Sequence, residues 1–296
     1  MRVLERKTTS EDISTGATYW KRLTLDVQVS TYLVAAASLG YPVTSTLFDV
    51  LRKPGQKPSV AKQETPERYG ERVLEAICED PERYYARREI VRLEKDAFEA
   101  ATDLWQTASA IRDARRLRVF PRNADACMQW SRECQYLNIC AGIADANDPV
   151  MYVVEPKKHG ELDMADFVGD LELLTQSSAR AYRSCPRKYE LRYERRLRST
   201  QLKAGPLRKG SSVHKGLEVF SLTGDLEAGI GALETEEPFS RAHERAMLIG
   251  YAARWDHEPL KYVAIEKEFL FPLRNPETGA ASKTFIVGGR LDGIVE

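Results

Sequence analysis

Alternating apolar and polar positions near both ends of the chain predict β-strands. Residues 2–8 form one short alternating run, and 43–51 form a second that stops before Pro54. Near the other end, residues 262–271 and 284–296 alternate in the same way and are separated by an Asn-Pro-Glu-Thr-Gly sequence typical of a turn. The pattern therefore predicts at least four strands, two at each end of the chain.

Between these strands the apolar positions recur at helical spacing. Residues 24–40 predict a helix closed by Gly40, and the charged stretch 66–118 predicts two or three helices with one apolar stripe. Thr175 is placed to cap a further helix. Residues 210–221 and 238–255 also have helical periodicity, so we expect an α/β protein.

Length and composition limit the class of protein. A chain of 296 residues with 43% apolar content can form one large domain or two ordinary ones. Lys plus Arg and Asp plus Glu both number 44, which disfavours binding of polyanions by bulk charge, so any nucleic-acid surface must be local. No apolar run reaches about 18 residues, no signal-peptide pattern is present and the cysteines number five, so we expect a cytoplasmic protein without membrane contact or disulfides.

Ionisable residues at the two ends would meet if the end strands pair. With Val295 opposite Arg2 in an antiparallel pair, Asp292 faces Glu5, and Lys7 lies on the same sheet face. Two adjacent carboxylates repel one another unless a cation lies between them, and Mg²⁺ or Mn²⁺ suits oxygen ligands. The alternative is structural, because Glu and Lys at alternate strand positions are ordinary solvent-facing residues and an Asp-Gly pair often forms a turn.

The residues of this patch belong to the motifs Gly289-Arg-Leu-Asp292 and Glu5-Arg-Lys7, and two further motifs accompany them: Gly210-Ser-Ser-Val-His214-Lys-Gly-Leu-Glu and Gln28-Val-Ser-Thr-Tyr32. Together they resemble the signature of the PD-(D/E)xK nuclease superfamily in its RecB-like branch. The resemblance implies a restriction-endonuclease-like fold, with a mixed central sheet flanked by helices, a helical subdomain and a cysteine-bound cluster.

The resemblance also implies roles for individual residues. The residues that it assigns to a catalytic Mg or Mn ion are His214, Asp292, Glu5 and the backbone carbonyl of Arg6. It assigns positioning of the attacking water to Lys7, and it places Gln28 and Tyr32, four apart on one helical face, against the metal site and the phosphates. The structural alternatives are an ordinary helical histidine, and a polar helix edge with a packing aromatic.

Four cysteines form a second candidate site. Cys127, Cys134 and Cys140 have the spacing C-x6-C-x5-C, and Cys185 precedes Pro186. Taken alone, they could be buried small hydrophobic residues, a zinc site or an iron–sulfur cluster, although no C-x2-C knuckle is present. Ser184-Cys185-Pro-Arg-Lys-Tyr189 resembles the first cluster ligand of the iron–sulfur members, such as the AddB-type and CRISPR-associated exonucleases, which implies a [4Fe-4S] cluster.

A basic stretch surrounds Cys185. Residues 180–198 carry eight basic and two acidic side chains, a net charge of eight minus two, or plus six. Interleaved tyrosines could stack bases while arginines contact phosphates; the alternative is a solvated helix face. The residues that we assign to DNA binding are Arg180, Arg183, Arg187, Lys188 and Tyr189.

The order of the motifs departs from that of the family. There the cysteine-bearing CPRKY motif comes first and the ExK motif follows the Asp, whereas here Glu5 and Lys7 precede both. We therefore expect a circular permutation: residues 1–143 correspond to the family's C-terminal half, 144–170 to a linker at the original termini, and 171–296 to its N-terminal half. Both halves are expected to form one nuclease domain.

The sequence thus predicts metal-dependent hydrolysis of DNA by an exonuclease that acts on single-stranded or end-containing DNA. The alternative is an inactive DNA-binding or scaffold protein with a structural zinc or iron–sulfur site. No Gly-x4-Gly-Lys-Ser/Thr motif is present, so a helicase or recombination partner must be a separate chain. We expect Cys78 in the core, and His159, His243 and His257 at the surface.

Overall fold

The structure is a computed structural model, and it describes residues 1–59, 61, 63–129, 132–164, 168–200 and 206–296. The chain divides into two compact units. Unit 1 comprises Met1–Leu93, Ala204–Lys267 and Leu291–Glu296, and unit 2 comprises Glu94–Lys203 and Glu268–Arg290. The expected linker at 144–170 lies wholly within unit 2.

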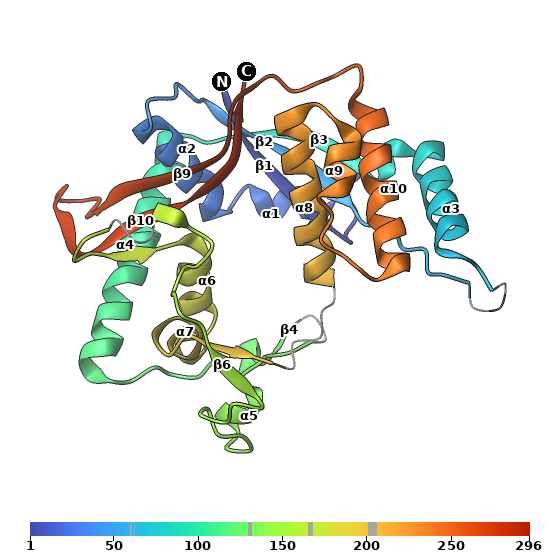
Figure 1. Cartoon of the computed structure of the whole chain (residues 1–296). Helices are drawn as coiled ribbons and strands as arrows, with labels where there is room; N and C mark the ends of the chain where they lie inside the picture. The colour runs from blue at the N-terminus through green and yellow to red at the C-terminus, as the bar shows by residue number, and fades with distance from the viewer. Residues whose placement is uncertain (60, 62, 130–131, 165–167, 201–205) are drawn as a thin grey trace. The chain divides into compact units, whose positions relative to one another are not determined.

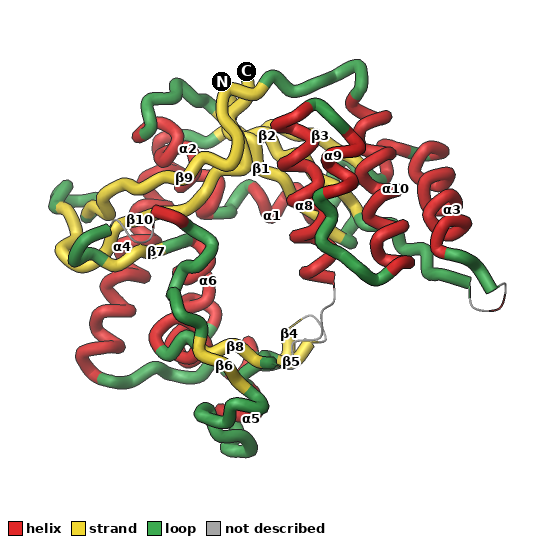
Figure 2. Tube along the Cα trace, in the orientation of Figure 1, coloured by secondary structure: helices red, strands yellow, loops and turns green. Residues whose placement is uncertain are grey.

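Helices and strands alternate along much of the chain, and Figure 2 distinguishes them by colour. The elements that lie wholly in unit 1 are β1 (Arg2–Thr9), α1 (Thr18–Leu23), α2 (Val27–Ser38), β2 (Ser45–Arg52), α3 (Pro66–Glu79), β3 (Tyr85–Val91), α8 (Pro206–Thr223), α9 (Leu226–Gly231) and α10 (Pro238–Trp255). Those in unit 2 are α4 (Glu94–Leu117), β4 (Met128–Gln129), β5 (Arg132–Glu133), α5 (Leu137–Cys140), β6 (Tyr152–Val154), β7 (Glu172–Leu174), α6 (Gln176–Ser184), α7 (Pro186–Tyr189) and β8 (Leu197–Ser199). The long strands β9 (Tyr262–Arg274) and β10 (Ala281–Val295) contribute to both units.

The sheet of unit 1 joins the two ends of the chain. Its strands lie in the order β3-β2-β1-β10, with β1 parallel to β2 and antiparallel to β10. Arg2 pairs with Val295 and Leu4 with Gly293, which confirms the register predicted from the sequence. Figure 1 shows the two termini side by side at the ends of these strands. The fold is thus mixed α/β, with a central mixed sheet flanked by helices.

Different helices cover the two faces of this sheet. On one face, α3, α8, α9 and α10 pack around Leu51 of β2 and Tyr85 of β3. On the other, α1 and α2 pack their buried residues against Phe48 and Val50 of β2. Neighbouring side chains on β2 point to opposite faces, so one strand serves both cores and β1 beside it is buried along most of its length.

Local sequence signals set the ends of α2. Asp26 is the N-cap, and its side chain accepts a hydrogen bond of 2.9 Å from the backbone N–H of Gln28. Gly40 ends the helix with a φ of +86°, a conformation that glycine adopts at little cost. The helix therefore begins three residues later than the periodicity alone predicts.

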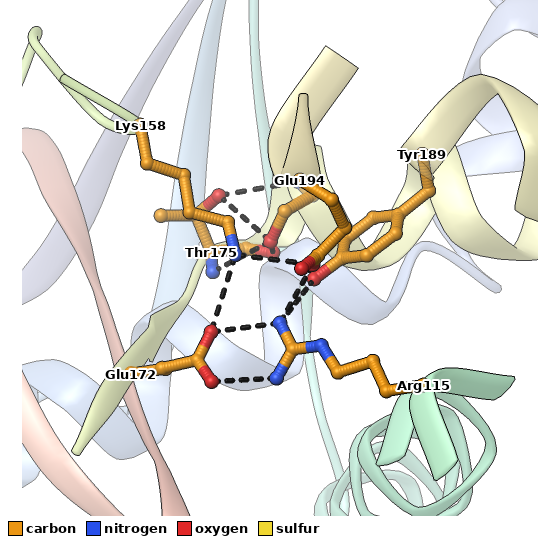
Figure 3. Close-up of polar contacts among 7 residues, drawn as sticks. Arg115, Lys158, Glu172, Thr175, Tyr189 and Glu194 are labelled. Atoms are coloured by element: carbon orange, nitrogen blue, oxygen red, sulfur yellow. Dashed lines mark hydrogen bonds and ion pairs between the residues drawn. The ribbon is translucent and has the colours of Figure 1, made fainter. Parts of the chain in front are cut away.

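A charged network organises unit 2 (Figure 3). The guanidinium of Arg115 on α4 donates to both carboxylate oxygens of Glu172 at 2.6 and 2.7 Å and to Glu194 at 2.6 Å. Lys158 donates to the same two glutamates at 3.2 Å each. Two cations thus balance two carboxylates and connect α4, β7 and the segment that follows α7.

Three expectations about individual segments and side chains are wrong. The stretch expected to be wholly helical contains β3, which pairs antiparallel with β2. Cys78 is exposed, because the buried stripe of α3 is formed by Tyr69, Val73 and Ile77 instead. His159 and His243 are buried, at 3% and 4% exposure, whereas only His257 is exposed among the three histidines expected at the surface.

None of the described helices is both long enough and apolar enough to cross a membrane.

The buried His243 makes folding stability depend on pH. Its Nε2 lies 3.1 Å from the carbonyl oxygen of Pro54, and its ring stacks on Tyr69. Burial, helped by nearby lysines, lowers the pKa of His243 from 6.5 to about 4. The unfolded chain therefore binds a proton first as the pH falls, so the stabilising contribution is complete above pH 6.5 and is lost toward pH 4.

We predict that this single group removes about 3 kcal/mol of unfolding free energy between neutral pH and pH 4. His243→Gln keeps an N–H donor for Pro54 without titrating, so its unfolding free energy should fall less over that range. Urea denaturation at several pH values measures the difference, with exposed His257→Gln as the control. Identical pH dependence in wild type and His243→Gln would contradict the prediction.

Candidate active site

The predicted acidic pair lies where β1 and β10 meet. Glu5 is 3% exposed, and its Oε1 forms an ion pair with the ammonium of Lys7. The carboxylate of Asp292 accepts a hydrogen bond of 2.6 Å from the backbone N–H of Arg6, the central residue of Glu5-Arg-Lys7. The structure therefore brings together residues almost the whole chain apart in sequence.

Helix α2 adds the predicted glutamine and tyrosine to the same place. The amide nitrogen of Gln28 donates to Glu5 Oε1 at 3.0 Å and to the Tyr32 hydroxyl at 2.8 Å. Its amide oxygen accepts from Lys7 at 3.5 Å. The spacing of four residues puts both side chains on one helical face, as the sequence predicts, and Gln28 links that face to the strand.

His214 lies on α8, and the packing of that helix determines its position. At Gly216 a Cβ would approach Leu248 to 2.6 Å and the Gly229 carbonyl oxygen to 3.0 Å, so only glycine allows α8 to lie this close to its neighbours. Burial lowers the pKa of His214, while the nearby Asp292 carboxylate opposes that shift. His214 is therefore neutral at physiological pH, the form that binds metals.

The electrostatics of the site indicate a missing positive charge. Burial raises the pKa of Glu5 to about 7, Lys7 lowers it in part, and the like charge of Asp292 raises it again. Glu5 Oε2 is buried and has no hydrogen-bond partner among the described residues. An orphaned carboxylate oxygen beside a second carboxylate and a neutral imidazole is a donor set that fits Mg²⁺ or Mn²⁺. Even so, no group of three or more His, Cys, Asp or Glu is close enough in the described part of the chain to hold a metal ion as it stands.

The side chain of Arg6 lies on the opposite face of β1, where it supports the strand. Its guanidinium is buried and donates to the hydroxyls of Ser221 at 2.6 Å and of Tyr262. The observed polar contact of its backbone with the site is the N–H bond to Asp292; the role of its carbonyl as a metal ligand remains a prediction.

Sequence reasoning missed one acid at the site. Asp26, the N-cap of α2, is close enough to add to the negative potential at Glu5 and Lys7. An N-cap preference identifies Asp26 once the helix is known to begin at Val27, but the apolar periodicity extends past it and hides the signal.

All four candidate cysteines line one small cavity in unit 2. Cys127, Cys134, Cys140 and Cys185 surround it together with Lys188. Burial raises the pKa of the Cys134 and Cys140 thiols, and the other cysteines raise it further, which shows that the thiols are close enough to interact. The thiols are free, and as a donor set they suit a soft metal or an iron–sulfur cluster, but their arrangement is not that of a closed metal centre.

The basic stretch around Cys185 is largely paired with acids. Arg183 lies 3.8 Å from Asp103, and Arg187 lies 2.7 Å from Glu190. Tyr189 is 1% exposed and packs against Tyr182 and Tyr193, so its ring is unavailable to stack on a base, in contrast to the expectation. The cationic side chains, and not the Tyr189 ring, are therefore the groups of this stretch that could contact a phosphate.

Comparison with known proteins gives one match. Residues 173–295 are similar to the family model of the PD-(D/E)XK nuclease superfamily. The matched part is less than half of the 296-residue chain. It contains Cys185, His214 and Asp292, and it leaves Glu5 and Lys7 outside. No curated protein and no solved structure matches the chain. The similarity points to nuclease activity.

The unpaired Glu5 oxygen predicts that divalent metal stabilises the folded chain. Excess Mn²⁺ should raise the melting temperature of the wild type by roughly 5 °C relative to EDTA, because an ion that binds only the folded state stabilises it. Glu5→Gln should abolish this shift without lowering the melting temperature in EDTA, since it removes a charge that Asp292 repels. Glu11→Gln, at an exposed acid, is the control. An equal Mn²⁺ shift in Glu5→Gln would show that the ion binds elsewhere.

Proposed function

We propose that this protein is a Mg²⁺- or Mn²⁺-dependent deoxyribonuclease that hydrolyses DNA phosphodiester bonds, acting as an exonuclease on single strands or ends. The observation that carries the proposal is the hydrogen bond from the backbone N–H of Arg6 to the Asp292 carboxylate. This bond unites the Asp of one motif with the Glu-x-Lys of another, and the family similarity covers only the first of them.

Glu5, Asp292 and His214, with the Arg6 carbonyl, are the proposed metal ligands. The ion would polarise a phosphoryl oxygen and lower the pKa of a bound water. Burial alone would lower the pKa of Lys7, but the carboxylates of Glu5, Asp292 and Asp26 oppose burial, and the pKa of Lys7 is raised overall. Lys7 is therefore a cation at neutral pH, and its role is to orient water or a phosphate oxygen as a hydrogen-bond donor rather than to remove a proton.

Gln28 and Tyr32 position these groups. The Gln28 amide holds Glu5 Oε1 and, through its own oxygen, contacts Lys7, so it fixes the two side chains of the motif relative to each other. Burial raises the pKa of Tyr32, and nearby Glu5 raises it further. Its hydroxyl stays neutral and can donate to a phosphate oxygen.

We further propose that the motif order is a circular permutation within one nuclease domain. In support, the family match of residues 173–295 begins close to the expected boundary at 171. The ExK motif and the Gln28 helix lie outside that match, yet they contact the matched strand β10 or one another. Residues 1–143 and 171–296 would then be the family's two halves in exchanged order.

The proposed substrate and setting follow from the same resemblance. Arg180, Arg183, Arg187 and Lys188 are the proposed DNA contacts of unit 2, acting on phosphates rather than on bases. A helicase or recombination partner would supply single strands as a separate chain, in the cytoplasm.

If the protein is an exonuclease with this active site, degradation of DNA requires both Lys7 and a free DNA end. End-labelled linear single strands should be degraded in Mn²⁺, whereas a closed single-stranded circle should resist. Lys7→Ala should lower the rate by roughly two orders of magnitude or more, because a fixed donor at the reacting phosphate is lost. Lys283→Ala, an exposed lysine of β10, should leave the rate unchanged.

Unchanged digestion by Lys7→Ala would overturn the site assignment. Cutting of the circle would show that the protein acts as an endonuclease and not as an exonuclease. An inactive wild type that still binds DNA would support the second candidate, an inactive DNA-binding or scaffold protein.

We also propose that Cys127, Cys134, Cys140 and Cys185 bind a [4Fe-4S] cluster. Support comes from the gathering of all four thiols around one cavity, where burial raises the pKa of the Cys134 thiol and the neighbouring Lys188 opposes that rise. Binding would require the thiols to converge further than they do here.

Iron and acid-labile sulfide should therefore copurify in equal amounts from anaerobic preparations, with broad visible absorbance. Cys134→Ser should lose the iron, because each ligand is required for a stable cluster. Cys78→Ser is the matched control, since Cys78 is an exposed cysteine of unit 1. Zinc in place of iron, or iron retained in Cys134→Ser, would contradict the proposal.

A further inference from the structure

Unit 1 contains a cleft that no residue of the ExK site lines. It has a volume of about 760 Å³ and lies at the start of β3, the last strand in the sheet order on this side. The loop 12–15, the end of β2 and the end of α10 form its walls. A volume of this size is typical of ligand sites.

Positive charge is concentrated in the cleft wall. The arginines that line it are Arg52, Arg83, Arg87, Arg88 and Arg254. Arg87 is neutralised by buried Asp49, 3.4 Å away. Arg88 donates to the neutral hydroxyl of Thr15 at 2.8 Å and lies over the Trp20 ring. Neither Arg83 nor Arg88 makes an ion pair within the described residues, so their charges are available.

The acidic residues that line the cleft form only weak ion pairs with its arginines. Asp12 lies 3.9 Å from Arg52, at the limit of an ion pair, and Arg254 forms an ion pair of 3.5 Å with exposed Glu258 one helical turn away. All four lining acids are exposed, whereas Arg52, Arg88 and Arg254 are half-buried. Pairs with exposed acids contribute little and are screened by salt. The lining acids equal in number the four arginines other than Arg87, but because these acids are exposed, the half-buried charge of the cleft wall is positive.

The aromatic residues of the cleft do not form a platform for a base. Tyr85 and Trp255 are 2% and 7% exposed. The guanidinium groups of Arg87 and Arg254 lie 3.9 and 4.2 Å from the Trp255 ring and cover it. A ligand must therefore be recognised through its anionic groups, and guanidinium groups match phosphate oxygens in geometry and charge.

The register of the sheet relates this cleft to the candidate active site. Glu5 pairs with Phe48 on β2, and Phe48 pairs with Arg88 on β3, so the three residues form one row across the sheet. Residues in such a row share a face, and two strand spacings amount to about 10 Å. Arg88 is thus on the face of the sheet that carries Glu5 and Lys7.

We propose that this cleft binds the sugar-phosphate backbone of a nucleic-acid strand, independently of base sequence and of the metal site. Arg83 and Arg88, with Arg52 and Arg254, are the phosphate contacts. This inference goes beyond the proposed function, because it assigns a second anchoring site that holds a strand whether or not the chain cleaves it.

Binding can be measured without cleavage. Fluorescence anisotropy of a labelled single strand in EDTA, with Glu5→Gln as the background, separates anchoring from hydrolysis. Arg83→Ala with Arg88→Ala should weaken binding about tenfold. It should also reduce the slope of log K against log salt by about 1.4, since each lost phosphate contact of a single strand contributes about 0.7.

The matched control is Arg68→Ala with Arg245→Ala, which removes the same charge from exposed positions of α3 and α10 in unit 1. This control should change the affinity less than twofold. Arg83→Glu alone provides a second test in case the double variant misfolds, because Arg83 is exposed. Equal losses in both double variants would overturn the proposal, because bulk charge would then explain binding.

A competition arm separates a strand from a free phosphate compound. Pyrophosphate should displace the strand no better than its ionic strength predicts. Tight pyrophosphate binding that the Arg83/Arg88 variant loses, with strand binding unchanged, would assign the cleft to a small phosphate ligand and overturn the proposal. Unchanged digestion in the Lys7→Ala test would overturn the assignment of the metal site but leave this binding assay unaffected, so the two proposals fail separately.

Discussion

The pairing of β1 with β10 is the constraint on which the candidate active site depends. Arg2 opposite Val295 and Leu4 opposite Gly293 fix the register, and a slip of one residue would turn Glu5 and Lys7 to the other face of the sheet. Apolar burial enforces the register, because Val3, Leu4, Ile294 and Val295 are fully buried. The chemistry of the site is thus positioned by the hydrophobic core beside it.

The site itself is held together at an energetic cost. Glu5 and Asp292 repel each other, and burial deprives Glu5 of water, which is why its pKa rises to about 7. Lys7 and Gln28 compensate in part through one oxygen, while the second oxygen of Glu5 remains unpaired among the described residues. Strain of this kind is typical of functional sites, because a ligand that supplies the missing charge relieves it.

Much of this arrangement was predictable from sequence, because it depends on short-range patterns. Alternation identified β1 and β10, and the spacing of Gln28 and Tyr32 identified a shared helical face. The errors arose where tertiary packing overrides local pattern. The charged run at β3 is a strand because β2 offers it a partner, and His243 is buried because Tyr69 and Pro54 enclose it. Asp26 was missed because apolar periodicity continued past a helix cap.

The distance in sequence between the two paired strands also has a consequence for folding. The ladder joins residues 2–4 to residues 293–295, so closing it requires ordering nearly all of the intervening chain. Contacts of such long range form late and slowly, since loop-closure entropy must be overcome before they contribute. During synthesis, Glu5 and Lys7 emerge from the ribosome long before Asp292. A nascent chain therefore carries an incomplete acidic pair, and the candidate site is assembled only after β1 and β10 have paired.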